Sequence, residues 1–475
     1  MTHTSTGTGT TPVFAVVGRP NKGKSSIVAT LARDDSVRID AHAGSTRQAR
    51  RFPMQIDGQT LYELVDTPGI QRARAVLDWL VAHCSDAASR AAAVQRFVKE
   101  HARDPVYVNE IQMLEPIVEG AGIIYVVDGS CPFAADYEAE MEILRWTGRP
   151  SLAVINPIDS DDFVQEWTAG LGQYFQTVRT FNAHRAEFEK QLDLLALFGH
   201  LDPHWRAPLE RAVTVLREDR EMQHRAASYL ITDLIVEALQ YRVEQSVPDG
   251  VPLHPIKQTL FALYKKNLVR AEGRCRRQVE ELFHHRALHT AESQLIFDDA
   301  DLFNVADWYL WGLNKRQLVS VASVAGGLAG GSAGMVLDAA TGGLLGGLGT
   351  LVSGLGGAAT SAGGAWLYAE QIARIKVKGL PSGGQLVTYG PSRNLNFPFV
   401  LLGRALQHHR LVSARSHATR DVLKLGEPVL AWLTDADRKQ LARLFGDISA
   451  DKKRQERRCE LAAKVLHWCL QVDRG

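Results

Sequence analysis

The sequence predicts an α/β domain with a mostly parallel sheet, followed by a helical region, a glycine-rich apolar hairpin and a small C-terminal α+β region. Three observations support this order. An apolar run at residues 13–17 leads into a loop and then a helical pattern, helical spacing dominates residues 186–312, and 15 of the 40 glycines lie between residues 326 and 364. The predicted parts are a flexible leader (1–11), the α/β domain (12–185), the helical region (186–315), the hairpin (316–370) and the C-terminal region (371–475).

The composition argues against several classes of protein. The 54 Lys and Arg residues balance 53 Asp and Glu residues, and a net charge of +1 gives no support to a polyanion-binding protein. The five cysteines are odd in number and never spaced CxxC, which argues against a disulfide framework or a zinc finger. Residues 1–11 have neither a basic n-region nor an apolar core, so we expect no signal peptide and place the chain in the cytoplasm.

The first strand is expected at residues 13–17, because a continuous apolar run is typical of a strand buried on both faces. It leads into GRPNKGKS at residues 18–25, which satisfies the pattern GxxxxGK[ST], and a helical pattern starts at Ser26. The backbone N–H groups of such a loop cradle phosphates at the positive end of a helix. Lys24 is expected to reach the β- and γ-phosphates, and the Ser25 hydroxyl to ligate Mg²⁺. These features predict a P-loop NTPase domain.

A second strand is expected at residues 61–65 and ends in DTPG at residues 66–69. A carboxylate at a strand tip, here Asp66, belongs at the Mg²⁺ of a P-loop enzyme. The amide of Gly69 can approach a γ-phosphate because no Cβ intervenes. Apolar runs predict further strands at residues 123–128 and 151–155, and a strand-like pattern predicts another at 177–180.

With the segment Gly44-Ser45-Thr46-Arg47 between them, these motifs resemble the TrmE–Era–EngA–septin branch of translation-factor-class GTPases, the 50S ribosome-binding GTPase type. That branch shows a GxPNxGKS loop, a TTR-like switch I and DTPG. The resemblance implies a G domain that binds GTP and GDP. It also implies that Thr46, with Ser45 as the alternative, completes the Mg²⁺ shell, and that Lys24, Thr46 and Gly69 serve hydrolysis.

Guanine recognition is expected in two later loops. Asn156 and Asp159 stand at the matching positions of an NKxD motif, but Pro157 replaces its lysine and removes a stem that would pack on the base. A carboxylate at Asp159 accepts from the N1–H and exocyclic amine of guanine, which adenine does not offer. Asn182 and Ala183 fit the second guanine loop, where the Ala183 amide would face the guanine oxygen.

The expected site therefore combines the P-loop, DTPG and the two guanine loops. Its nucleotide-binding residues are Gly18, Arg19, Pro20, Asn21, Lys22, Gly23, Lys24, Ser25, Ser26, Asp66, Thr67, Pro68, Gly69, Asn156, Asp159, Asn182 and Ala183. Its Mg²⁺ ligands are Ser25, Thr46 and Asp66.

Slow hydrolysis is expected, because Ile70 stands where Ras-like enzymes carry a water-orienting glutamine and Gln71 comes one residue late. The related branch often uses a potassium ion held partly by the P-loop asparagine, which is Asn21 here. The alternative is that Asn21 only stabilises the loop. The resemblance thus implies Mg²⁺ as cofactor, K⁺ as a candidate, and turnover accelerated by potassium or by nucleotide-dependent self-association.

Residues 71–120 form an Ala-rich insertion with helical spacing that small GTPases of this branch lack. It directly follows switch II, so it either reports the nucleotide state to a partner or elaborates the packing. The insertion, the segment YEAEME at residues 137–142 and the modified guanine loops resemble a bacterial subfamily. In that subfamily an Era-type GTPase domain is fused to a C-terminal domain of unknown function.

Histidines in the second half of the chain are the candidate metal ligands. His285 and His289 lie four residues apart, and Glu292 is a further turn away, a spacing that permits metal ligation on a helix. No HExxH motif and no further ligand set accompanies them. We therefore interpret these side chains, and likewise His408 and His409, as solvated.

The hairpin at residues 316–370 contains two uncharged stretches, 317–337 and 339–369. A membrane-crossing helix takes about 20 residues, and membrane helices pack closely through glycines four residues apart, as found here. Aromatic and basic residues flank the segment, which suits a hairpin with both ends cytoplasmic. We expect residues 317–369 to insert into or associate with a lipid bilayer. A buried soluble hairpin and a disordered loop are the alternatives.

Beyond residue 371, alternation predicts strands at residues 374–378 and 385–389, and helical spacing predicts helices at 399–411 and 435–472. The last helix carries a basic cluster that suits an anionic surface, although such clusters are usually solvated faces. Its members are Lys452, Lys453, Arg454, Arg457 and Arg458.

Three functions follow as hypotheses. The leading one is a GTP-hydrolysing switch at the cytoplasmic face of the inner membrane. The second is a soluble Era-like GTPase in ribosome or RNA maturation; the near-neutral charge and the lack of an RNA-binding signature count against a nucleic-acid partner. The third is a GTP-binding scaffold with little turnover, favoured by Ile70 and Pro157.

Overall fold

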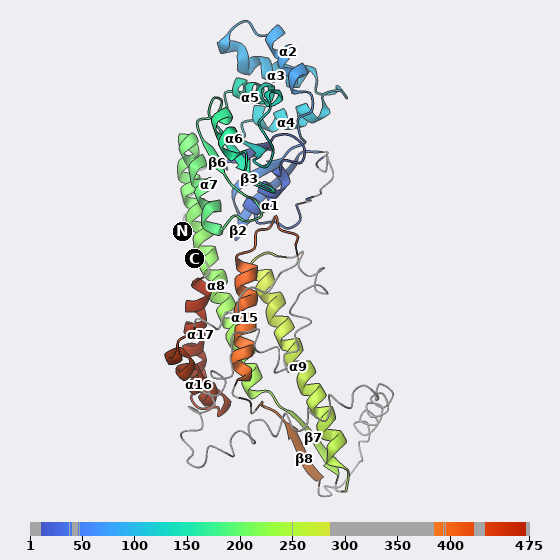
Figure 1. Ribbon diagram of the computed structural model, residues 1–475, viewed down its shortest axis with the longest axis vertical. Helices are drawn as coiled ribbons and strands as arrows, with labels where there is room; N and C mark the ends of the chain where they lie inside the picture. Colours follow the sequence, from blue (N-terminus) through green and yellow to red (C-terminus); the bar gives the residue numbers. More distant parts are fainter. Residues whose placement is uncertain are drawn as a thin grey trace, which may run out of the picture.

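The computed structural model describes residues 11–37, 39, 46, 48–248, 250–285, 384–392, 394, 396–421 and 433–471. The molecule is elongated, with an α/β domain at one end and a helical bundle at the other (Figure 1). The expected hairpin at 317–369, the expected strand at 374–378, and His289 and Glu292 lie outside the described residues.

The α/β domain is built on a six-stranded sheet in the order β2-β3-β1-β4-β5-β6. All neighbouring strands run parallel except β2 and β3. The strands are β1 (Val13–Val17), β2 (Arg50–Ile56), β3 (Gln59–Asp66), β4 (Gly122–Asp128), β5 (Ser151–Asn156) and β6 (Val178–Thr180). The mostly parallel P-loop fold is thus confirmed.

The sequence analysis did not anticipate β2. This strand forms a hairpin with β3 through Asp57 and Gly58, which both adopt positive φ, 50° and 77°. Asp-Gly between two strands is a typical two-residue hairpin turn, because both central residues must adopt positive φ. The dipeptide was therefore a usable signal for this hairpin.

Two layers of helices cover the sheet. On one face lie α1 (Lys24–Ala32), α7 (Phe188–Leu201) and the first half of α8 (Pro203–Gln240), packed on Phe14 and Val16 of β1. The other face, with Ala15 and Val17, is covered by α2 (Ala73–Ala82), α3 (Arg90–Glu100), α4 (Val108–Val118), α5 (Glu138–Trp146) and α6 (Val164–Leu171). Because Trp205, Leu209 and Leu216 belong to the first core, the α/β domain extends beyond the expected boundary at residue 185.

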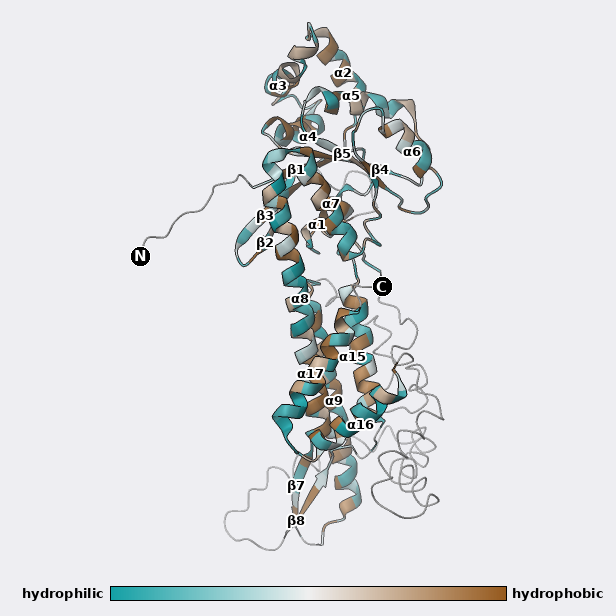
Figure 2. Cartoon of the chain, turned by 90° about the vertical axis from the view of Figure 1, so that its left-hand side faces the viewer, coloured by the Kyte–Doolittle hydropathy of each residue, from teal (hydrophilic) through white to brown (hydrophobic). Residues whose placement is uncertain are grey.

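The expected insertion at residues 71–120 contains α2, α3 and α4, with the short 3₁₀ helix η1 (Ala87–Ser89) between the first two. A second 3₁₀ helix, η2 (Ala135–Tyr137), precedes α5. In both overall views α2 and α3 lie at the end of the molecule farthest from the helical bundle (Figures 1 and 2).

The helix α8 connects the two parts of the molecule. Its 38 residues span about 57 Å, and its second half packs in the core of the bundle. The other bundle helices are α9 (Leu253–Leu282), α15 (Phe397–Ser413), α16 (Asp435–Ser449) and α17 (Arg454–Leu470). Apolar residues concentrate where these helices face one another (Figure 2).

Two expectations for the second half need correction. The expected single helix at residues 435–472 is divided into α16 and α17, with Lys453 in the left-handed region at φ 47°. Residues 243–248, inside the region expected to be helical, form the strand β7 (Val243–Pro248). It pairs antiparallel with β8 (Gly384–Tyr389), which confirms the strand expected at residues 385–389.

The interpretation of His285, His408 and His409 as solvated is wrong, since their exposed fractions are 2%, 1% and 1%. His408 Nε2 lies 2.9 Å from a carboxylate oxygen of Glu280, and His409 Nε2 lies 3.0 Å from Nδ1 of His224. Burial lowers the pKa of His408, although Glu280 opposes the shift. These polar partners lie more than a hundred residues away along the chain, where no local pattern points to them.

The basic cluster at residues 452–458 forms ion pairs with neighbouring carboxylates. Arg457 contacts Asp447 and Glu460, and Arg458 contacts Asp233 of α8 at 2.7 Å. These pairs reduce the positive charge that this face offers to an anionic surface.

Within the part of the chain that the structure describes, no helix combines the length and the apolar character needed to cross a membrane.

Candidate functional site

A cavity of about 630 Å³ lies at the carboxyl ends of the parallel strands, the usual ligand position in such sheets. Residues 20, 21 and 23–26 of the P-loop line it, together with Thr46, Gly69, Asp128 and Asp159. The motifs that the sequence analysis singled out therefore meet at one site.

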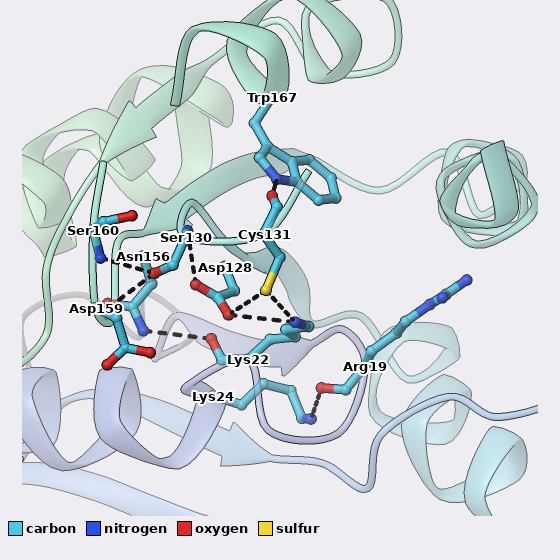
Figure 3. Close-up of polar contacts among 10 residues, drawn as sticks. All are labelled: Arg19, Lys22, Lys24, Asp128, Ser130, Cys131, Asn156, Asp159, Ser160 and Trp167. Carbon is cyan, nitrogen blue, oxygen red and sulfur yellow. Dashed lines mark hydrogen bonds and ion pairs between the residues drawn. The ribbon is translucent and has the colours of Figure 1, made fainter. Parts of the chain in front are cut away.

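The P-loop wraps the start of α1. Gly23 has φ 83°, and a Cβ at this position would lie 2.1 Å from Nδ2 of Asn156, so only glycine fits. Lys24 is the first residue of α1, is 6% exposed, and donates from Nζ to the carbonyl of Arg19 at 2.8 Å (Figure 3). Burial lowers the pKa of Lys24 to about 8, although the charge of Asp66 opposes the shift.

Arg19 points away from the phosphate loop and is held from the side of α5. Its guanidinium pairs with Glu140 and lies 3.8 Å from the centre of the Tyr137 ring. Glu140 is 2% exposed and also accepts from the hydroxyl of Tyr125 at 3.0 Å. The side chain of Arg19 therefore fixes the loop to α5, while its backbone carbonyl accepts the hydrogen bond from Lys24.

The three expected Mg²⁺ ligands lie together. Ser25 donates to Asp66 Oδ2 at 2.7 Å, Thr46 donates to the same oxygen at 3.0 Å, and the two hydroxyl oxygens are 3.2 Å apart. Burial raises the pKa of Asp66, opposed by hydrogen bonds from Ser25 and Thr46 and by the charge of Lys24. Two hydroxyls and a carboxylate form an all-oxygen donor set, which Mg²⁺ prefers, so these residues fit the ion. The expected alternative, Ser45, lies outside the described residues.

The DTPG segment is fixed from both sides. Thr67 donates to the carbonyl of Val16 at 2.7 Å. A Cβ on Gly69 would lie 2.5 Å from the backbone nitrogen of Pro20, so Pro68 and Gly69 follow the P-loop closely. Ile70 is 4% exposed and belongs to the core between the sheet and helices α2 to α6. This burial excludes its side chain from contact with an attacking water.

The insertion contacts the residues that follow DTPG. Glu110 of α4 is 1% exposed, and one of its carboxylate oxygens accepts from the backbone N–H groups of Gln71 at 2.9 Å and Arg72 at 2.8 Å. The sequence analysis missed this contact, and no local signal points to it.

The two expected guanine loops are joined by Asn156. Its side chain donates to the carbonyl of Lys22 at 3.4 Å and accepts from the amide of Ala183 at 3.2 Å. The Ala183 amide therefore faces Asn156, in contrast to the expectation that it would face the guanine oxygen. Asn182 also connects the two loops, because its side chain donates to the carbonyl of Pro157 at 2.6 Å and accepts from the amide of His184 at 3.0 Å.

Asp159 lines the cavity, and its loop is held by Ser130, whose hydroxyl accepts from the amides of Asp159 at 2.8 Å and Ser160 at 3.2 Å (Figure 3). Lys22 turns from the loop towards Asp128, with 3.3 Å between Nζ and Oδ2. Asn21 is exposed at φ 60° and lines the cavity near the phosphate loop.

Several cavity residues were not expected from the sequence. Asp128 ends β4 at the edge where ligands bind, and that position was a usable signal. No signal marked Ala418, Arg420 and Asp421, which reach the cavity from the segment after α15.

Two family matches divide the chain. Residues 13–156 match the family described as 50S ribosome-binding GTPase, and residues 169–465 match the family described as domain of unknown function (DUF3482). The first match ends with β5 and the second begins within α6, so both boundaries lie inside the α/β domain.

Curated proteins similar to this chain include GTPases named Der. The protein from Mycoplasma pneumoniae is 40% identical over 70 residues, 15% of each chain. The one from Aromatoleum aromaticum is 29% identical over 160 residues, 33% of this chain and 30% of its own, and the one from Prochlorococcus marinus is 25% identical over 209 residues, 42% and 39%. The matches thus span less than half the length of these relatives.

Solved structures of Era are also similar. A variant from Aquifex aeolicus bound to GDP and AlF4⁻ is 16% identical, and the match covers 57% of this chain and 88% of that one at a TM-score of 0.26. Era in complex with MgGDPNP and part of 16S ribosomal RNA is 15% identical, with 57% and 89% covered at the same score.

Proposed function

The chain belongs to the family of the domain of unknown function DUF3482, with a 50S ribosome-binding GTPase domain before it, and from this premise we propose that it binds GTP and hydrolyses it as a conformational switch. The observation that carries the proposal is the convergence of Ser25, Thr46 and Asp66 within 3.2 Å of one another, beside Lys24 and Gly69.

In this proposal the P-loop binds the phosphates through its backbone N–H groups and the N-terminus of α1. Ser25, Thr46 and Asp66 would hold Mg²⁺, which would neutralise phosphate charge. Lys24 exchanges its bond to the Arg19 carbonyl for the β- and γ-phosphates. Gly69 brings its amide to the γ-phosphate. Because Thr46 and Gly69 lie on separate loops, loss of the γ-phosphate releases both loops.

Guanine is the proposed base. Asp159 lines the cavity at the end away from Lys24, and a carboxylate there accepts from the N–H groups that guanine offers. Asn156 contributes indirectly, because it ties the P-loop to the loop of Ala183. Binding of GDP and ADP, compared by calorimetry, tests the assignment, and equal affinities would contradict it.

The decisive experiment compares the full-length protein with Lys24→Ala. Loss of a charge-assisted phosphate contact is expected to weaken GTP binding by more than about tenfold and to abolish phosphate release. Lys99→Ala, an exposed position of α3, is the matched control and should behave as wild type. Unchanged GTP affinity in Lys24→Ala would refute the proposed phosphate site.

Potassium and self-association are further parts of the proposal. Asn21 lies exposed at the phosphate end of the cavity, where a monovalent cation could be shared with the nucleotide. We expect faster phosphate release in KCl than in NaCl, and the difference should vanish in Asn21→Ala. Equal rates in both salts would leave Asn21 as a loop-stabilising residue. Sedimentation with GDP and with a non-hydrolysable GTP analogue tests nucleotide-dependent self-association.

The proposed place of action is the cytoplasmic face of the inner membrane. Its support is the pair of uncharged, glycine-rich stretches in residues 317–369. Flotation of the full-length protein with liposomes tests it, and a protein that stays wholly in the soluble fraction would refute it.

The second candidate is an Era-like role on the ribosome or its RNA, favoured by the family match of residues 13–156. Co-sedimentation with ribosomes in the presence of a GTP analogue tests this candidate. A third candidate, a GTP-binding scaffold, requires tight binding without measurable phosphate release.

A further inference from the structure

The segment that follows α15, residues 414–421, leaves the bundle and packs against the α/β domain. Ala418 is fully buried in the same core as α1 and the sheet. The hydroxyl of Ser416 lies 2.9 Å from that of Thr30 in α1 and also donates to the carbonyl of Ala183 at 2.5 Å. This segment is therefore attached to the body of the GTPase domain.

The same segment forms hydrogen bonds with the two loops that border the cavity. Thr419 donates to the carbonyl of His184 at 3.0 Å, next to the guanine loop. Arg420 donates to the carbonyls of Asp35 and Val37, both at 3.1 Å, at the start of the loop that carries Thr46. A third bond, to the carbonyl of His417 at 2.6 Å, fixes the guanidinium to its own segment.

The tip of the segment faces the nucleotide cavity. Ala418, Arg420 and Asp421 line it together with Asp159 and His184, and the side chains of Arg420 and Asp421 are exposed. The charge of Asp421 acts on His184: burial lowers the pKa of His184, and Asp421 opposes that shift. Asp421 is thus placed at the guanine loop.

Charge divides the cavity into two ends. Lys24 and the N-terminus of α1 make one end attractive to phosphate. Asp159 and Asp421 bring two carboxylates to the cavity wall, and carboxylates repel phosphate but accept hydrogen bonds from ribose hydroxyls and from the N–H groups of a base. Asp128 also lines the cavity, but its carboxylate is paired with Lys22. Asp159 and Asp421 are therefore suited to the nucleoside.

We propose that residues 418–421 complete the nucleotide site: Asp421 binds the nucleoside half of the guanine nucleotide, and Arg420 positions the start of the loop that carries Thr46. The proposal rests on the proposed function. It makes the DUF3482 part of the chain a contributor to GTP binding, so the nucleotide and the helical bundle share a contact.

Calorimetric titration of the full-length protein with Mg²⁺-GDP and with Mg²⁺-pyrophosphate tests the proposal. Pyrophosphate occupies only the phosphate end. For Asp421→Ala we expect about tenfold weaker GDP binding, the loss from one hydrogen bond to a charged group, and pyrophosphate affinity within twofold of wild type. For Arg420→Ala, which releases the start of the loop that carries Thr46, we expect weaker binding of both Mg²⁺-GDP and Mg²⁺-pyrophosphate. Arg410→Ala, an exposed position in the last turn of α15, is the matched control and should change neither affinity.

Three outcomes would overturn the proposal. GDP affinity within twofold of wild type in Asp421→Ala would show that the segment does not contact the nucleotide. A parallel loss of GDP and pyrophosphate binding in Asp421→Ala would show that this substitution only disturbs the fold. Unchanged binding of both ligands in Arg420→Ala would refute the positioning role of Arg420. A wild-type protein that binds no GDP would instead refute the proposed function itself, so the two failures are distinguishable.

Discussion

The contact between Glu110 and the backbone after DTPG provides a direct test of how the insertion acts. The carboxylate is 1% exposed and accepts from the N–H groups of Gln71 and Arg72 at 2.9 and 2.8 Å. Glu110→Ala removes the acceptor and leaves the two amides without it. The insertion would then lose this carboxylate tether to the loop after the expected γ-phosphate contact.

The cost follows from the two bonds. A hydrogen bond to a charged group contributes about 1.5–3 kcal/mol, so the lower value for each gives a loss of about 3 kcal/mol. In a domain of this size, 1 kcal/mol shifts Tm by about 2–4 °C, which gives a decrease of roughly 6–12 °C. Glu110→Gln keeps an oxygen that accepts both bonds without the charge, and about half the decrease is expected.

Thermal unfolding followed by circular dichroism measures this decrease. Glu115→Ala, an exposed position on the same helix, controls for lost helical side chains. Single-turnover phosphate release should also slow in Glu110→Ala, while GDP affinity changes by less than about threefold, because the contact holds the γ-phosphate loop and not the base. The reasoning is wrong if Glu110→Ala melts within about 1 °C of wild type and releases phosphate at the wild-type rate.

Three further predictions concern the core, the pH dependence and the P-loop. Arg404 and Glu272 form an ion pair in which both side chains are 3% exposed. Arg404→Ala should lower the free energy of unfolding in urea by about 3–5 kcal/mol, and replacing both residues by Met and Leu should recover most of that loss. A loss below about 1 kcal/mol in Arg404→Ala would contradict the buried pair. Burial, together with neighbouring His285, lowers the pKa of His417 well below its ordinary value. The unfolded chain therefore binds the proton more tightly than the folded chain. The contribution of neutral His417 to the free energy of unfolding is fully present above about pH 6.5 and falls by up to about 1.4 kcal/mol per pH unit below it. His417→Gln should flatten that fall in thermal unfolding between pH 7 and 5, and an identical slope would argue against the assignment. Gly23→Ala should abolish GDP binding in calorimetry, because of its φ of 83° and the Cβ position 2.1 Å from Asn156; retained binding would mean that the loop adapts.

The sequence alone was enough to predict a nucleotide site wherever a short segment carries its own chemistry. The loop at residues 18–25 and DTPG are each eight residues or fewer, and their glycines, lysine and carboxylate are required by phosphate and Mg²⁺ in a fixed local order. The parallel strands were equally accessible, because burial on both faces imposes continuous apolar runs. The strand β2 could have been added from its Asp-Gly turn.

The role of Ala183 shows where local pattern was insufficient. Its loop follows β6, where the sequence predicted it, but the direction of its amide depends on Asn156, which lies 27 residues earlier. The histidines of α15 show the same limit: helical spacing places His408 and His409 on the helix, but their partners lie on α9 and α8. A polar residue can be buried only where a partner satisfies it, and the tertiary structure alone supplies that partner.

The sequence by itself determined that this protein has a P-loop GTPase domain and predicted which residues meet the phosphates and the metal. The tertiary structure decided that Glu110 holds the loop after DTPG, and that Arg420 and Asp421 reach the cavity beside the P-loop from a segment more than two hundred residues beyond the expected guanine loops. The physical reason is the range of the interactions. Phosphate binding is encoded in neighbouring residues, whereas a contact between distant segments depends on the packing of whole helices and leaves no periodicity in the chain.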